Sequence, residues 1–172
     1  MSPTYGSEFR AKRHTKQKGE RYEAFLKQYA CLIKGETNET SILANTCAAL
    51  KEAFGFFWVG FYMVKNGSLA LGPFQGSVAC YRIEKGRGVC GTAWAKACTI
   101  VVPDVNAFPG HIACSPLSRS EIVVPIIACN EVKGVLDIDS DKLNAFDETD
   151  KVCLEKAVSL LTEELYQFTT ER

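Results

Sequence analysis

Three cysteines of this sequence lie beside turns, where a thiol can react rather than only pack. They are Cys80 and Cys114, each at the end of a loop, and Cys90, in a glycine-rich turn. If these turns meet in one cleft, one thiol can attack a substrate and a second can form a disulfide with it. Three unrelated, half-buried thiols are the alternative, and the residues alone leave both open. His111, three residues before Cys114, is either a group that lowers the pKa of that thiol or a structural hydrogen-bonding residue.

The turn that carries Cys90 fits the dinucleotide-binding pattern G-x-G-x-x-G over residues 86–91. That pattern indicates a pyrophosphate site when a βαβ unit surrounds it, whereas its neighbours here are predicted hairpin strands. We therefore interpret the glycines as a tight turn that puts Cys90 near the N-terminus of a short helix. Such a position lowers the pKa of a thiol and favours the thiolate.

Three carboxylic acids are expected to lie together at the ends of two strands. Asp137 and Asp139 are two residues apart, so they point to one face of a strand, and Glu121 opens the preceding strand. Acids held together raise the pKa of at least one member, which provides a proton donor near neutral pH, and they attract a metal or an ammonium group. Because the chain has only two histidines, we predict no metal site and no cofactor. A solvated strand end is the alternative.

Trp58 and Tyr62 lie on one face of an aromatic strand with Gly60 between them. The missing side chain at Gly60 predicts a gap between the two rings that a small apolar group could occupy. Core packing explains most of the other aromatic residues in this strand.

Hydrophobic spacing and turn signals indicate the elements that position these groups. Helical periodicity is present in residues 20–33, 40–54 and 148–165, with Asn38, Gly55 and Asp147 as caps. Strands are predicted at residues 56–64, 69–74, 81–83, 99–102, 121–128 and 132–138. Asn66-Gly67 is a strong hairpin signal. Helices at both chain ends around hairpin-linked strands predict an α+β domain, an antiparallel sheet with helices packed on one face.

Length and composition predict one globular domain, residues 20–172, preceded by a flexible basic arm, residues 1–19. The chain has 172 residues, of which 47% are hydrophobic, so it can bury a core without disulfides. Twenty Lys and Arg balance twenty Asp and Glu, which disfavours nucleic acid as the main partner. We expect no membrane partner and a cytoplasmic location, since the longest apolar stretch is too short to span a bilayer and the N-terminus does not resemble a secretory signal.

The eight cysteines include no C-x-x-C pair, which disfavours a structural zinc site. Cys31, Cys47, Cys129 and Cys153 lie in apolar periodic segments and are predicted to pack as small hydrophobic residues.

The gathered residues resemble those of the free methionine-R-sulfoxide reductase family, whose members are single GAF domains. The resemblance runs from about residue 19 to residue 161. It rests on six segments in the same order, residues 58–62, 72–80, 86–91, 110–114, 120–125 and 134–140. It implies a GAF-like fold, a homodimer, and reduction of free L-methionine-(R)-S-oxide to L-methionine with thioredoxin as reductant. A GAF module that binds a small ligand or senses redox state without turnover is the competing hypothesis.

The resemblance also implies a role for each matching residue. Cys114 corresponds to the thiolate that attacks the sulfoxide sulfur and becomes a sulfenic acid, which a second thiol converts to a disulfide. Cys80 is expected to be the main resolving thiol and Cys90 a second partner. The other implied site residues are the acids Glu121, Asp137 and Asp139, with Glu121 and Asp139 as candidate proton donors, and the aromatic wall of Trp58 and Tyr62. The sequence departs from the family pattern at Asn106, Pro116 and Leu117, near the loop that carries Cys114.

Overall fold

Across the residues described, 5–112 and 114–166, the computed structural model contains one antiparallel sheet of six strands in the order β3-β2-β1-β6-β5-β4. The strands are β1 (Trp58–Lys65), β2 (Ser68–Gln75), β3 (Arg82–Ile83), β4 (Ile100–Val102), β5 (Ser120–Ala128) and β6 (Glu131–Ser140). Asn66 and Gly67 both have positive φ, 52° and 80°, and form the predicted β1–β2 hairpin turn.

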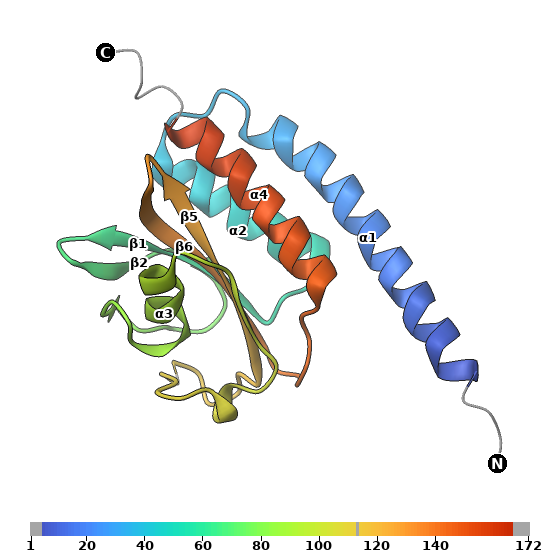
Figure 1. Ribbon diagram of the computed structural model, residues 1–172. Coiled ribbons are helices and arrows are strands. Elements are labelled where there is room, and N and C mark those ends of the chain that lie inside the picture. The colour runs from blue at the N-terminus through green and yellow to red at the C-terminus, as the bar shows by residue number, and fades with distance from the viewer. Residues whose placement is uncertain (1–4, 113, 167–172) are drawn as a thin grey trace.

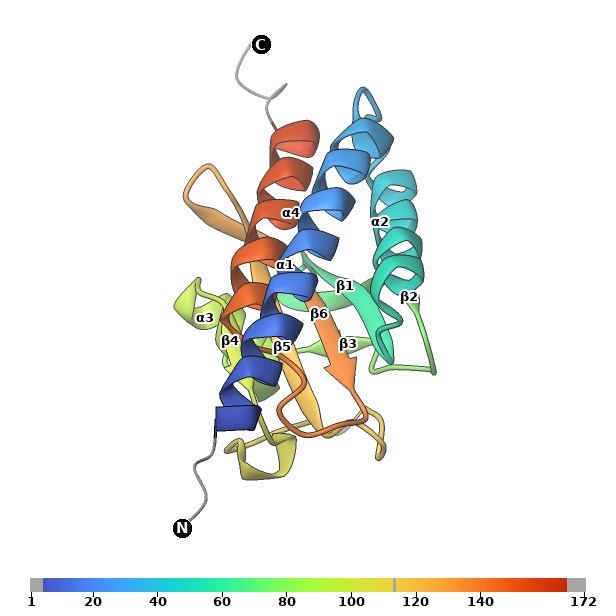
Figure 2. The ribbon, with the colours of Figure 1, turned by 90° about the vertical axis from the view of Figure 1, so that its right-hand side faces the viewer.

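Three helices cover one face of this sheet, namely α1 (Tyr5–Ile33), α2 (Glu39–Phe54) and α4 (Glu148–Tyr166). Figures 1 and 2 show α2 and α4 against the sheet and α1 on the outside, running alongside α4. Their apolar faces form the larger core with the inner faces of β1, β5 and β6. The predicted α+β architecture is confirmed.

The predicted helix ends at Asn38, Gly55 and Asp147 agree with the structure. The Asn38 side chain accepts a hydrogen bond from the Ser41 amide at 2.9 Å, and Gly55 ends α2 with a φ of 69°. The Asp147 side chain accepts one from the Thr149 amide at 2.8 Å. Each cap satisfies a backbone group that the helix itself leaves unpaired. In the described part of the chain, no helix is long and apolar enough to cross a membrane.

A fourth helix, α3 (Gly88–Lys96), lies on the opposite face of the sheet, together with the 3-10 helix Val105–Ala107. A second, smaller core joins α3 to the sheet and includes Trp58 and Tyr62. The glycine-rich turn serves backbone packing, because a side chain at Gly91 would overlap the Glu84 carbonyl oxygen. The expectation that helices pack on one face is met by α1, α2 and α4. Helix α3 covers the opposite face, which carries the predicted site residues.

The first helix begins at Tyr5, well before the predicted start at residue 20. Lys18, assigned above to the arm, forms ion pairs with two acids at the start of α4. Its Nζ lies 3.0 Å from Oδ2 of Asp147, and it also pairs with Oδ2 of Asp150. The end of the arm is thereby attached to the domain, because two acids of α4 attract this lysine. The flexibility of the arm remains a prediction, and residues 1–4 lie outside the described part of the chain.

The predicted packing of four cysteines is right for some of them only. Cys47 is fully buried and Cys153 is half-buried, but Cys31 and Cys129 are exposed. Cys31 lies on an outward position of α1, and Cys129 lies in the β5–β6 turn with a φ of 53°. A cysteine in an apolar segment is buried only where another helix or strand packs against its side of that segment. The spacing of apolar residues in the sequence does not show whether such packing occurs.

Candidate active site

The register of the sheet places two of the predicted acids and the tryptophan in one row. Asp139 on β6 pairs with Trp58 on β1 and with Glu121 on β5. Asp137 lies two residues along β6, opposite Gly60, and its side chain points to the same face. Three acids from two strands therefore line one pocket between the sheet and α3.

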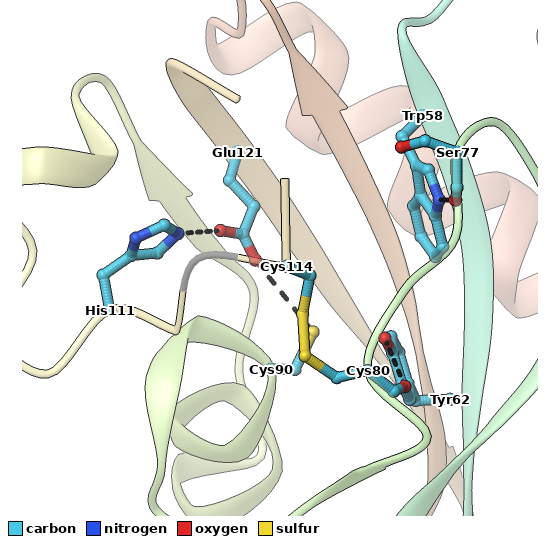
Figure 3. The surroundings of a disulfide bond; sticks show 8 residues. All are labelled: Trp58, Tyr62, Ser77, Cys80, Cys90, His111, Cys114 and Glu121. Carbon is cyan, nitrogen blue, oxygen red and sulfur yellow. Dashed lines mark hydrogen bonds and ion pairs between the residues drawn. A yellow bond between two sulfur atoms is a disulfide. The ribbon is translucent and has the colours of Figure 1, made fainter. Parts of the chain in front are cut away.

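Two of the predicted thiols are joined as a disulfide. Cys80 and Cys114 are 34 residues apart in sequence, and their Cα atoms lie 5.7 Å apart. Figure 3 shows this bond between His111 and Glu121 on one side and the Trp58 and Tyr62 rings on the other. Both cysteines are half-buried. The structure thus brings these two loop ends to the rim of the acidic pocket.

The third thiol, Cys90, lies inside the pocket and is buried. Its Sγ lies 4.0 Å from Oε1 of Glu121. Burial raises the pKa of the Cys90 thiol well above its ordinary value, and the charges of Asp137 and Glu121 raise it further. Cys90 does follow the start of α3, as predicted. The expectation of a lowered pKa was wrong, because burial and two neighbouring acids outweigh the helix terminus.

The three acids hold their protons more tightly than ordinary carboxyl groups. Burial raises the pKa of Asp139 to about 6, although a hydrogen bond from Ser118 and the charge of His111 oppose the rise. The pKa values of Glu121 and Asp137 are raised well above their usual range, first by burial and then by the neighbouring acids. Within the described residues, Oδ1 of Asp137 is a buried atom without a hydrogen-bond partner. Such a cluster can donate a proton and can accept a hydrogen bond from a ligand.

The only described histidine in the pocket faces an acid. Nε2 of His111 lies 3.6 Å from Oε2 of Glu121 (Figure 3). The sequence leaves open whether His111 lowers the pKa of Cys114 or is a structural hydrogen-bonding residue, and the contact that the structure shows is with Glu121. Ser118, which the sequence reasoning missed, is buried in the pocket and bonds Asp139. No spacing or motif singles out Ser118, because the loop that carries it forms no regular element.

The two aromatic rings line the pocket and are tied to the loop before Cys80. The Trp58 indole nitrogen donates to the Ser77 carbonyl oxygen at 2.9 Å, and the Tyr62 hydroxyl donates to the Cys80 carbonyl oxygen at 3.1 Å. A side chain at Gly60 would overlap the Trp58 ring. The predicted gap above Gly60 is therefore filled by Trp58 itself, so the rings form one wall of the pocket rather than the two sides of a slot.

Three of these side chains also offer atoms that a single cation could share. Among the described residues, ligand atoms of Cys90, Glu121 and Asp137 all lie within 4.8 Å of one another. The same atoms suit an ammonium group or a proton donor role, so the geometry alone does not indicate a metal.

Comparison with known proteins gives a consistent set of relatives. Residues 36–163 match the family described as GAF domain. GAF domain-containing protein A of Dictyostelium discoideum is 58% identical over 84% of this chain and 92% of that protein. Free methionine-R-sulfoxide reductase of Escherichia coli is 45% identical over 84% of this chain and 88% of that protein. A solved structure of free methionine-R-sulfoxide reductase from Neisseria meningitidis, in complex with its substrate, has a TM-score of 0.82 and 54% identity, with 83% and 87% of the two chains covered.

Proposed function

The chain belongs to the GAF domain family and, within it, to the free methionine-R-sulfoxide reductases, and on that premise we propose that it reduces free L-methionine-(R)-S-oxide to L-methionine with its own thiols. The observation that carries this proposal is the Cys80–Cys114 bond at the mouth of a pocket lined by three acids. A disulfide at that place is the product expected after one thiol has taken oxygen from a substrate and a second thiol has displaced it.

We assign the first step to Cys114 in the reduced protein. Its thiolate attacks the sulfoxide sulfur, the sulfoxide oxygen passes to Cys114 Sγ, and methionine leaves. Cys114 becomes a sulfenic acid. The oxygen must be protonated as it is transferred, because oxide is a poor leaving group. Glu121 and Asp139 supply this proton in our proposal, and their raised pKa values keep a proton available near neutral pH.

Asp137 and the aromatic wall are assigned to substrate recognition. The unpartnered Oδ1 of Asp137 suits a hydrogen bond from the substrate ammonium group. The rings of Trp58 and Tyr62 suit contact with the apolar end of methionine. A buried acid that needs an ammonium group explains selectivity for the free amino acid, since a peptide-bound residue has lost that charge.

The second step closes the disulfide and the third opens it. The Cys80 thiol attacks Cys114 Sγ, the S–O bond breaks, and water leaves as the Cys80–Cys114 bond forms. Thioredoxin then reduces the bond by thiol exchange. We keep Cys90 as a secondary partner only, because its raised pKa leaves less thiolate for exchange.

The free thiols and the family resemblance bear on the compartment and the oligomeric state of the protein. Six described cysteines are free thiols, which suits a reducing compartment, and we propose the cytoplasm. We also propose a homodimer, as the family resemblance implies, which light scattering of the purified protein tests.

A steady-state assay with dithiothreitol tests the reaction. We expect turnover of free L-methionine-(R)-S-oxide, and rates at least a hundredfold lower (an order-of-magnitude expectation for loss of a buried polar contact) for the S epimer, the N-acetylated R-sulfoxide and an oxidised protein. Absence of turnover on the free R-sulfoxide would favour a ligand-binding or redox-sensing module. Equal rates on the N-acetylated compound would contradict the role of Asp137.

A further inference from the structure

The most exposed large hydrophobic side chains of the described residues lie beside the disulfide. Val78 is 87% exposed, Tyr81 84% and Leu117 62%, and the other exposed large hydrophobic residues show 50% or less. Val78 and Tyr81 lie within two residues of Cys80, and Leu117 lies three residues after Cys114. We call these three residues the apolar collar.

Binding of the small substrate does not explain this exposure. Val78 lines the pocket, but Tyr81 and Leu117 do not. Exposed apolar side chains cost free energy in water, and a group of them marks a surface that another molecule covers. Tyrosine in particular is enriched among the residues that dominate binding energies.

The disulfide itself indicates which molecule must cover the collar. Reduction requires an attacking thiolate to approach along the S–S bond, so the reducing protein must contact the residues around Cys80 and Cys114. Both cysteines are half-buried, so the side chains around them take part in the approach of any reducing protein. A partner that reaches either sulfur therefore covers part of the collar.

The charges beside the collar favour an acidic partner. Segments 78–88 and 111–119 carry four exposed basic residues, Arg82, Lys85, Arg87 and Arg119, and a single acidic residue, Glu84. The chain as a whole has zero formal net charge, so this surface is more positive than the average. Opposite charges speed the encounter of two proteins and orient them.

We propose that the apolar collar is the docking surface for a dithiol oxidoreductase whose reactive cysteine lies in an apolar patch with an acidic rim. This inference rests on the proposed function, since it takes the disulfide as an intermediate of turnover. The partner's first thiolate attacks Cys80 Sγ, the Cys80–Cys114 bond breaks, and Cys114 leaves as a thiolate. The partner's second thiol then attacks the mixed disulfide, which frees Cys80 and leaves the partner oxidised. Attack at Cys80 is favoured because two of the three collar residues flank it.

Reduction of the isolated disulfide tests this without any need for sulfoxide. The oxidised protein is mixed with reduced thioredoxin, and separately with dithiothreitol, and free thiols are quantified over time by alkylation. For the double variant Tyr81→Ser/Leu117→Ser we expect the second-order rate constant with thioredoxin to fall about tenfold or more, the scale of losing two interface anchors. The rate constant with dithiothreitol should stay within about twofold of wild type, because a small reductant needs no docking surface.

Two further variants separate docking from general effects. Ile127→Ser removes an exposed apolar side chain six residues along β5 from Glu121, about 20 Å away at strand spacing, and should change neither rate constant. Arg82→Glu should slow thioredoxin more at low than at high salt. Trapping with a thioredoxin that lacks its second cysteine should attach it to Cys80.

Three outcomes would overturn the inference. They are a thioredoxin rate constant within twofold of wild type for the double variant, an equal loss of rate with dithiothreitol, and a double variant that loses dimerisation instead of thioredoxin reactivity. If the wild-type disulfide is reduced by thioredoxin as expected but the protein shows no sulfoxide turnover, the proposed function fails while the docking surface stands.

Discussion

Two buried aspartates on opposite faces of the sheet have almost the same exposure and opposite surroundings. Asp150, at the start of α4, is 2% exposed, and Asp137, in the pocket, is 7% exposed. Asp150 accepts hydrogen bonds from the Tyr22 hydroxyl and the Asp147 amide at 2.8 Å each, and it pairs with Lys18. Asp137 lies against the other acids and the Cys90 thiol, and its Oδ1 has no partner among the described residues.

A structural acid can be told from a functional one by the groups that compensate its buried charge. A buried carboxylate is costly unless donors and a cation compensate it, and Asp150 has all of these from its own chain. Asp137 has the Cys90 thiol as a donor, but no cation faces it and its Oδ1 has no partner among the described residues, so the fold leaves an arrangement that a ligand or a proton can complete. We expect substitutions on the helical face to change stability and substitutions on the pocket face to change activity.

The largest expected effect is on the pocket face. Cys114→Ser should abolish methionine formation even in a single turnover, because no thiol remains to take the oxygen, while its melting temperature stays close to that of the reduced wild type. Cys80→Ser should release about one equivalent of methionine and then fail to turn over with thioredoxin. Methionine released per enzyme in rapid mixing measures both. If Cys114→Ser released one equivalent and Cys90→Ser none, Cys90 would be the nucleophile.

The next effect belongs to the helical face. Asp150→Ala leaves the Tyr22 hydroxyl without its acceptor and Lys18 with one acid fewer, so we expect the free energy of unfolding to fall by about 3–5 kcal/mol. Urea titration measures this. Glu148→Ala, an exposed acid of the same helical turn, is the control and should cost less than about 1 kcal/mol. A loss of kcat/KM in folded Asp150→Ala, without a loss of stability, would contradict the assignment.

A smaller effect sharpens the assignment of the proton donors. Glu121→Gln and Asp139→Asn should each lower kcat/KM roughly a hundredfold, the usual scale of acid catalysis. A side-chain amide cannot transfer a proton to the departing oxygen, whereas a carboxylic acid can. Glu131→Gln, at the exposed start of the same strand as Asp139, should behave as wild type. Wild-type kinetics in the two pocket variants would mean that these acids are a passive strand end.

The smallest expected effect is a loss of stability as pH rises, caused by Asp139. An acid paired with a cation has the opposite effect, because its pKa is lowered by folding. The pKa of Asp139 is raised from 3.8 to about 6, so the folded protein retains a proton that the unfolded chain has already lost. The free energy of unfolding should therefore fall as pH rises from about 4 to 6, by on the order of 2 kcal/mol from this group. Asp139→Asn should be less pH-dependent across this range. A difference between the two proteins that is constant with pH would contradict the raised pKa.

The elements and the reactive chemical groups can be predicted from local sequence signals. Apolar spacing, the Asn66-Gly67 turn and the caps at Asn38 and Asp147 are local signals, and each is repeated in the structure. The two-residue spacing of Asp137 and Asp139 is local as well, since neighbouring positions of a strand alternate between faces. Local geometry of this kind depends on the nearest few residues, so it can be read without knowing the fold.

Long-range packing sets which of these groups meet and which protonation state each one favours. The Cys80–Cys114 pairing joins loops 34 residues apart, and the contact of His111 with Glu121 joins a loop to β5. The raised pKa of Cys90 shows the reason most clearly. A helix N-terminus is visible in the sequence, but burial and the approach of acids from β5 and β6 depend on long-range packing, and in a buried site these outweigh the local effect.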